Sequence, residues 1–218
     1  MTRKIGITNH GDAGIDFQWV KVLEQDNSLD CAIILTRCLN EEMVKPLLRF
    51  QHKIILSISV SGYAGTAIEP HTPTTDTVLQ TLSDLLDKGF PQKQVLLYIA
   101  PVIPTAKGLK RADEVFHAFS GTVTHIRTNL IETNPVIQER FTALGMPLPD
   151  IQTKQQTAFA DMVAGWKADD PASDIVIKGI CPQNAVELLG TPYRCINHCA
   201  HCKWEDNTNN LEEILLSI

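Results

Sequence analysis

Three cysteines near the end of the sequence are the residues best suited to chemistry. Cys195, Cys199 and Cys202 follow a C-x3-C-x2-C pattern. Three thiolates on one short loop can ligate three irons of a [4Fe–4S] cluster, since cysteine thiolates are the usual ligands of such clusters. The fourth iron then keeps an open coordination position, which distinguishes a catalytic metal site from a closed structural one. The spacing therefore predicts a cluster that can bind a small molecule.

Other metal sites are compatible with the same residues. In a structural zinc site, Cys199 and Cys202 would form a knuckle, and Cys195 with His198 or His201 would complete four ligands. Alternatively, Cys181 could supply a fourth thiolate and close an iron–sulfur cluster. We prefer the open cluster, because a three-residue gap is atypical of zinc and the second half of a paired zinc motif is missing. The segment could also bind no metal.

The composition indicates the class of protein and the cellular compartment to which these cysteines belong. The chain has 218 residues, of which 44% are hydrophobic and 20% charged, as in ordinary globular proteins. A net charge of −6 argues against a broad nucleic-acid-binding surface. No secretory signal is recognisable at the start, and no apolar run approaches the roughly 20 residues that span a bilayer. We therefore expect a cytoplasmic protein without a membrane partner, whose cysteines are reduced.

Apolar, β-branched runs recur along the chain and predict six strands. Several of them are continuous rather than alternating, which is typical of parallel strands buried on both faces. The predicted strands are Lys4–Thr8, Cys31–Arg37, Lys53–Ser61, Gln94–Ile103, Thr122–Leu130 and Asp174–Ile180.

Segments of helical periodicity separate these strands. Asn40 and Asn134 are expected helix N-caps, and Gly89 is an expected helix end. The predicted helices are Asn40–Phe50, Thr74–Lys88, Lys107–Phe119, Asn134–Leu144, Thr153–Lys167 and Asn184–Leu189. Strand–helix alternation predicts an α/β fold with about six parallel strands, either an open sheet or a partial (β/α) TIM-like barrel, and we prefer the barrel. We expect residues 1–190 to form it and residues 191–218 to form a cysteine-rich loop packed on it.

The cysteine spacing resembles the signature of the radical S-adenosylmethionine (SAM) superfamily. In that superfamily the triad usually follows the first barrel strand, whereas here it follows the last unit, so the resemblance implies a permuted barrel. It also implies that SAM chelates the fourth iron and is cleaved to methionine and a 5′-deoxyadenosyl radical. The implied partners are an electron donor and a substrate, either a small molecule or a macromolecule, of unknown identity.

Other segments resemble domain-of-unknown-function family 1848, whose members carry a C-terminal C-x3-C-x2-C motif. The likeness is strongest over Ser59–Pro70, which is similar to the family's Thr-x-Thr-Gly-Tyr-Gly…Leu-Glu-Pro segment. It continues over Tyr98–Thr105, Gly179–Cys181 and Asn184–Gly190, and near Asp12. The resemblance implies a fold and a cofactor more than a substrate.

Polar residues at the end of the third predicted strand are candidate SAM ligands. Ser59, Ser61 and Glu69 lie where parallel strands present functional groups, at their carboxyl ends. The more common explanation is local: serine hydroxyls bond to nearby backbone, and a glutamate before Pro70 stabilises a turn. Two other functions stay open: a non-catalytic binding module with zinc or a closed cluster, and an acid–base enzyme that uses His10, Asp12 and Glu69.

Overall fold

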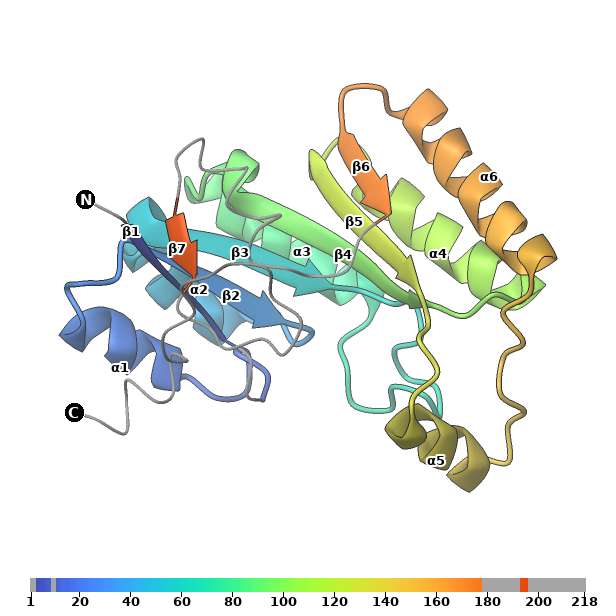
Figure 1. Ribbon diagram of the computed structural model, residues 1–218. Helices are drawn as coiled ribbons and strands as arrows, with labels where there is room; N and C mark the ends of the chain where they lie inside the picture. The colour runs from blue at the N-terminus through green and yellow to red at the C-terminus, as the bar shows by residue number, and fades with distance from the viewer. Residues whose placement is uncertain (1–2, 9–10, 178–192, 196–218) are drawn as a thin grey trace. The chain divides into compact units, whose positions relative to one another are not determined.

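The computed structural model describes residues 3–8, 11–177 and 193–195 (Figure 1). Strands and helices alternate along most of this part of the chain. The strands are β1 (Arg3–Ile7), β2 (Cys31–Thr36), β3 (Ile54–Ser59), β4 (Val95–Val102), β5 (His125–Leu130), β6 (Asp174–Ile177) and β7 (Tyr193–Cys195). The helices are α1 (Gln18–Gln25), α2 (Glu41–Arg49), α3 (Thr75–Asp87), α4 (Ala106–Phe119), α5 (Pro135–Ala143) and α6 (Thr153–Asp169).

The described residues divide into two compact units. The first unit consists of the described residues within 1–58, 80–96 and 193–195. The second unit consists of residues 59–79 and 97–177. The boundary expected at residue 190 lies outside the described residues, as does the helix expected over Asn184–Leu189.

The first unit contains four strands in the order β7-β1-β2-β3, and every neighbouring pair is parallel. Ile5 of β1 lies opposite Cys31 of β2 on one side and opposite Cys195 of β7 on the other. Cys31–Ile34 and Ile54–Ile58 are almost entirely shielded from solvent. These uninterrupted buried runs explain why the sequence shows continuous rather than alternating hydrophobicity.

Helix ends in both units follow the local sequence signals. The Asn40 side chain accepts a hydrogen bond from the Met43 N–H at 3.3 Å, and Asn134 accepts one from the Ile137 N–H at 3.0 Å. Gly89, just past α3, has φ +98°, a conformation that glycine adopts without steric cost. The predicted caps are therefore confirmed.

The second unit contains the strand order β6-β5-β4, with β5 and β6 parallel. The rings of Phe116 in α4 and Trp166 in α6 stack with centroids 4.9 Å apart, which fixes these two helices against each other. Arg127 of β5 is 2% exposed, and its guanidinium donates to a carboxylate oxygen of Asp174 at 2.8 Å. This ion pair joins β5 to the start of β6.

The predicted α/β class with parallel strands is confirmed, and all six predicted strands are present. The three-residue strand β7 was not predicted, whereas the two helices that lie between β5 and β6 were. Within the described residues, neither run of strands closes on itself, so the fold is a partial, open form of the barrel. No described helix is both long enough and apolar enough to span a bilayer.

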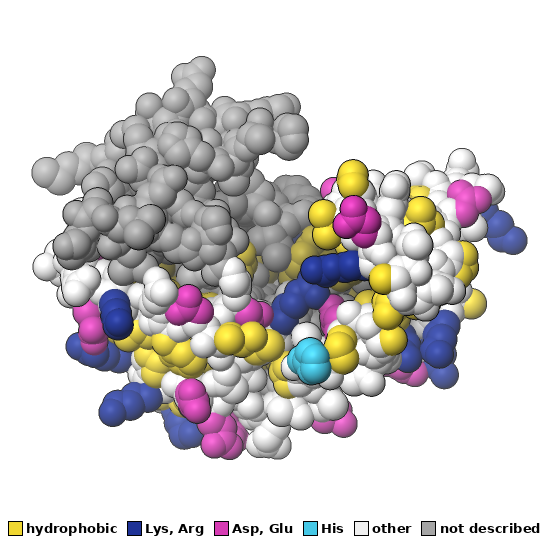
Figure 2. Space-filling view, turned by 90° about the horizontal axis from the view of Figure 1, so that it is seen from below, with side chains coloured by type: hydrophobic (Ala, Val, Ile, Leu, Met, Phe, Trp, Pro, Cys, Tyr) yellow, Lys and Arg dark blue, Asp and Glu magenta, His cyan; other side chains and the backbone are white. Residues whose placement is uncertain are grey.

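Charged side chains on the described surface are mixed in sign. On the face drawn in Figure 2, Lys and Arg side chains are interspersed with Asp and Glu. Among the residues that the structure describes, no single sign of charge dominates in this view.

Candidate functional site

The first cysteine of the triad is the last residue of β7. Because β7 runs parallel to β1, the chain leaves Cys195 toward the edge of the sheet where β1 and β2 also end. Functional groups of parallel α/β proteins gather at this edge. Cys199 and Cys202 lie outside the described residues, as do Cys181, His198 and His201. Within the described part of the chain, no group of three or more His, Cys, Asp and Glu side chains is arranged to hold a metal ion.

Asp12 occupies the loop that follows β1 in the first unit. Its carboxylate accepts hydrogen bonds from the Thr36 hydroxyl at 2.6 Å, the Arg37 N–H at 2.6 Å and the Gly14 N–H at 2.9 Å. These bonds tie the loop to the carboxyl end of β2. Asp12 therefore stabilises this edge of the sheet. His10, its suggested partner in acid–base catalysis, lies outside the described residues.

At the same edge of the sheet, the backbone of the loop after β1 packs closely against the backbone of the loop after β2. A Cβ atom on Gly14 would lie 2.1 Å from the Cys38 carbonyl oxygen, so no larger residue fits without a shift of the backbone. The Asn40 amide donates to the Gly14 carbonyl at 2.7 Å and to the Cys38 carbonyl at 3.0 Å. The loops after β1 and β2 are consequently held together independently of any ligand.

The three candidate SAM-binding residues all belong to the second unit. The Ser59 hydroxyl donates a long hydrogen bond of 3.4 Å to the Ala100 carbonyl of β4. The Ser61 hydroxyl donates to a carboxylate oxygen of Glu69 and accepts from the Tyr63 N–H at 3.2 Å. The structure thus brings Ser61 and Glu69 into direct contact, whereas Ser59 bonds to the neighbouring strand. Their role as SAM ligands stays a prediction.

The loop between β3 and α3 is held in one conformation by specific contacts. Gly62 has φ +75°, and its carbonyl accepts a hydrogen bond of 2.6 Å from the Arg111 guanidinium of α4. The same guanidinium lies over the Tyr63 ring, 5.0 Å from its centroid, in cation–π geometry. Arg111 therefore anchors the loop through both a backbone and an aromatic contact.

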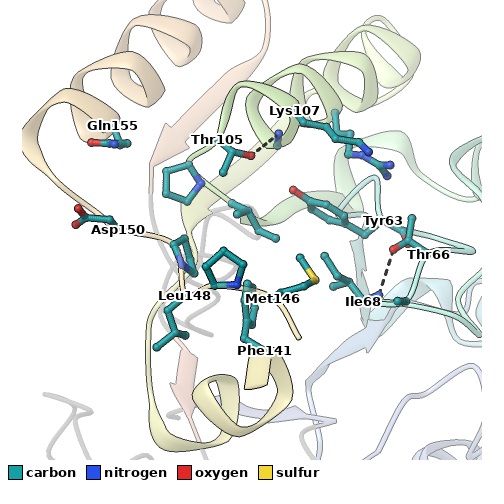
Figure 3. Close-up of a pocket in the computed structure, with 17 residues that line it drawn as sticks. Tyr63, Thr66, Ile68, Thr105, Lys107, Phe141, Met146, Leu148, Asp150 and Gln155 are labelled. Carbon is teal, nitrogen blue, oxygen red and sulfur yellow. Dashed lines mark hydrogen bonds between the residues drawn. The ribbon is translucent and has the colours of Figure 1, made fainter. Parts of the chain in front are cut away.

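A pocket of about 460 Å³ opens beside this loop, entirely within the second unit (Figure 3). Its walls come from the β3–α3 loop, the start of α4, and the segment from the end of α5 to the first turn of α6. Buried Tyr63, Ile103 and Phe141 form one hydrophobic cluster there, against which Ile68 and Met146 pack. Cationic Lys107 and Arg111 also line the pocket.

Tyr63 is the most strongly perturbed polar group in the pocket wall. Burial raises the pKa of its hydroxyl above the ordinary value of 10.0, and the negative charge of Glu69 adds to the rise, while Arg111 acts in the opposite direction. Tyr63 is therefore a neutral hydroxyl at physiological pH.

Sequence reasoning did not identify this pocket. The segment Pro147–Asp150 reads as a surface loop, and only the overlapping apolar run Met146–Pro149 indicates that it covers other residues. The pocket forms because three segments far apart in the sequence meet, which no local pattern encodes.

The sequence matches no protein-family model and no curated protein. Among solved structures, the chain resembles spore photoproduct lyase complexed with dinucleoside spore photoproduct, with a TM-score of 0.52 and 14% sequence identity. That match covers 72% of this chain and 54% of the lyase chain, so this chain spans about half the length of the lyase. A 4-hydroxy-2-oxoglutarate/2-dehydro-3-deoxyphosphogluconate aldolase matches over 83% of this chain at 14% identity, with a TM-score of 0.26.

The match to spore photoproduct lyase defines the class of fold. The likeness shows that this chain shares the α/β fold of the matched part of spore photoproduct lyase. At 14% identity the likeness extends to the fold alone.

Proposed function

We propose that this chain is a radical-SAM-like iron–sulfur protein in which Cys195, Cys199 and Cys202 hold a [4Fe–4S] cluster. The observation that carries this proposal is the parallel pairing of β7 with β1, because it brings Cys195 to the edge of the sheet where the β-strands end. The likeness in fold to spore photoproduct lyase, a radical SAM enzyme, supports the same assignment. The proposal includes membership of domain-of-unknown-function family 1848.

The donor set fits this cofactor. Three thiolates satisfy three irons of a cubane cluster and leave the fourth for SAM. With SAM bound, the cluster would supply an electron that cleaves the sulfonium and yields a carbon-centred radical. The residues of this chain bind and orient the cofactors and exclude water from them. The Ser61 hydroxyl, by bonding to Glu69, fixes the direction of a carboxylate that we assign to SAM binding together with Ser59.

The cluster assignment predicts the cellular compartment and the partners of the protein. Cluster ligands must be thiolates, which persist in the reducing cytoplasm, and we place the protein there. Reductive cleavage of SAM also requires an electron donor as a partner, and a substrate whose hydrogen is abstracted.

Anaerobic reconstitution with iron and sulfide tests the proposal. We expect a brown protein that binds about four irons per chain, whose EPR spectrum after reduction changes when SAM is added. Replacing Cys195, Cys199 or Cys202 with alanine should abolish the colour. Cys38→Ala is the matched control, because Cys38 lies in the described part of the first unit and outside the triad.

Two results would contradict the proposal. A colourless protein that binds one zinc tightly would establish a structural metal site instead. A brown protein whose EPR spectrum is unchanged by SAM would establish a closed cluster in a non-catalytic binding module.

A further inference from the structure

We infer that the pocket beside Tyr63 is a binding site for a small molecule with an apolar body and a single carboxylate. This inference goes beyond the iron–sulfur assignment and does not depend on it. All the residues that line the pocket belong to the second unit, whereas Cys195 belongs to the first.

The size and lining of the pocket suit an apolar small molecule. A volume of about 460 Å³ lies within the range of roughly 300–1,000 Å³ that is typical of ligand sites. Ile103 and Phe141 are 6% and 4% exposed and form the buried part of the wall, and Ile68 and Met146 pack on them. In Figure 3 the side chains of Ile68, Met146 and Phe141 gather below Tyr63. An apolar body placed there is removed from water, which favours binding.

The start of α4 gives one side of the pocket a positive charge. Lys107 and Arg111 are four residues apart on this helix, and residues at this spacing share one helix face. The Arg111 guanidinium contacts Gly62 and Tyr63, whereas the Lys107 side chain forms no hydrogen bond or ion pair within the described part of the chain. The ammonium group of Lys107, in the first turn of α4, is thus available to an anion, and the helix dipole favours negative charge at the same place.

The opposite side of the pocket selects against a second negative charge. In Figure 3, Asp150 and Gln155 lie together, away from Lys107 and Tyr63. Asp150 carries a carboxylate, and the Gln155 Oε1 atom is shielded from solvent without accepting a hydrogen bond from any described residue. Both groups are acceptors, so a second anionic group here would meet repulsion. The ligand is therefore a monoanion rather than a dianion such as a phosphate ester.

Calorimetric titration of the full chain tests this inference with three related probes. The first is 6-phenylhexanoate, the second is its neutral analogue 6-phenylhexan-1-ol, and the third is 6-(4-carboxyphenyl)hexanoate, which adds a second carboxylate. We expect the monocarboxylate to bind about tenfold more tightly than the alcohol, which is the effect of one added ion pair of about 1.4 kcal/mol. The dicarboxylate should bind more weakly than the monocarboxylate. Titrations run with and without the cluster should agree, which separates this inference from the proposed function.

Matched lysine variants identify the anion-binding group. Lys107→Met should reduce the affinity for 6-phenylhexanoate to that of the alcohol. Lys107→Arg should retain most of the wild-type affinity, because arginine keeps the positive charge. Lys110→Met is the control, since Lys110 is exposed on the same helix, pairs with Glu114 at 3.6 Å and does not line the pocket. Absent binding, equal affinities for acid and alcohol, tighter binding of the dicarboxylate, or an equal effect of the two Met variants would each overturn the inference.

Discussion

The backbone of Cys195 lies opposite that of Ile5, in parallel register, although nearly the whole chain separates the two residues. This pairing connects the predicted cluster segment to the first strand of the fold. It also means that the position of Cys195 depends on a strand of only three residues.

The pairing predicts that breaking β7 releases iron without unfolding the rest of the protein. Proline at position 194 removes a backbone N–H and fixes φ near −65°, both of which oppose the strand. We expect Arg194→Pro to lower the iron content after reconstitution by more than half, while Arg194→Ala retains it. Iron analysis and circular dichroism of both variants provide the measurement. Full iron retention by Arg194→Pro would show that β7 does not position the cluster.

Asp12 is expected to contribute to stability rather than to catalysis. Its carboxylate accepts hydrogen bonds from three donors, so Asp12→Ala leaves all three without their acceptor. We expect a loss of about 2–4 kcal/mol in the free energy of unfolding, measured by urea denaturation. Asp16→Ala is the control, because Asp16 makes an exposed hydrogen bond to the Gln18 N–H, and its loss should cost less than about 1 kcal/mol. Equal effects of the two substitutions would refute this role of Asp12.

Two glycines within helices should respond oppositely to alanine. A Cβ on Gly108 of α4 would lie 2.0 Å from the Ile103 carbonyl oxygen and 2.7 Å from the Tyr63 hydroxyl, whereas one on Gly165 of α6 would meet no atom within 4 Å. Gly108→Ala should therefore destabilise the protein by about 2 kcal/mol or more. Gly165→Ala should stabilise it by about 0.5–1 kcal/mol, because alanine favours the helix. Thermal unfolding of both variants measures the difference in sign.

Cys31 makes stability sensitive to alkaline pH. Burial, with a smaller contribution from the charge of Asp30, raises the pKa of the Cys31 thiol from 9.0 to about 12. The folded state therefore favours the protonated thiol, and this contribution is complete below pH 9. Between pH 9 and 12 the unfolded state loses the proton first, so stability should fall by up to about 1.4 kcal/mol per pH unit.

Urea denaturation of wild type and Cys31→Ala between pH 8 and about pH 11 measures this contribution. The variant should show a shallower decline, whereas Cys38→Ala should keep the slope of wild type. Identical slopes in wild type and Cys31→Ala would mean that Cys31 titrates normally in the folded protein.

The sequence predicted most of the fold because its signals are local. Continuous β-branched runs identified β1 to β6, and Asn40 and Asn134 marked helix starts that depend only on the next three residues. Strand β7 was not predicted, because three residues within a cysteine-rich segment are too few to show a hydrophobic periodicity. It becomes a strand because β1 offers an unpaired edge.

The candidate site was less predictable because its contacts are distant in sequence. Ser61 and Glu69 were singled out from their place after a strand, but their mutual hydrogen bond depends on the fold of the intervening loop. Asp12 reads as a turn residue, yet two of its partners are 24 and 25 residues away. The cation–π contact between Arg111 and Tyr63 likewise joins segments that no pattern relates.

The pairing of β1 with β7 also affects how the protein is made. During synthesis, β1 and β2 emerge early and can pair, but the other edge of β1 has to wait for residues 193–195 to leave the ribosome. An unpaired strand edge is a site for association with other chains. Nascent protein should therefore be most prone to aggregate just before β7 is released, and chaperones that shield strand edges should act in that interval.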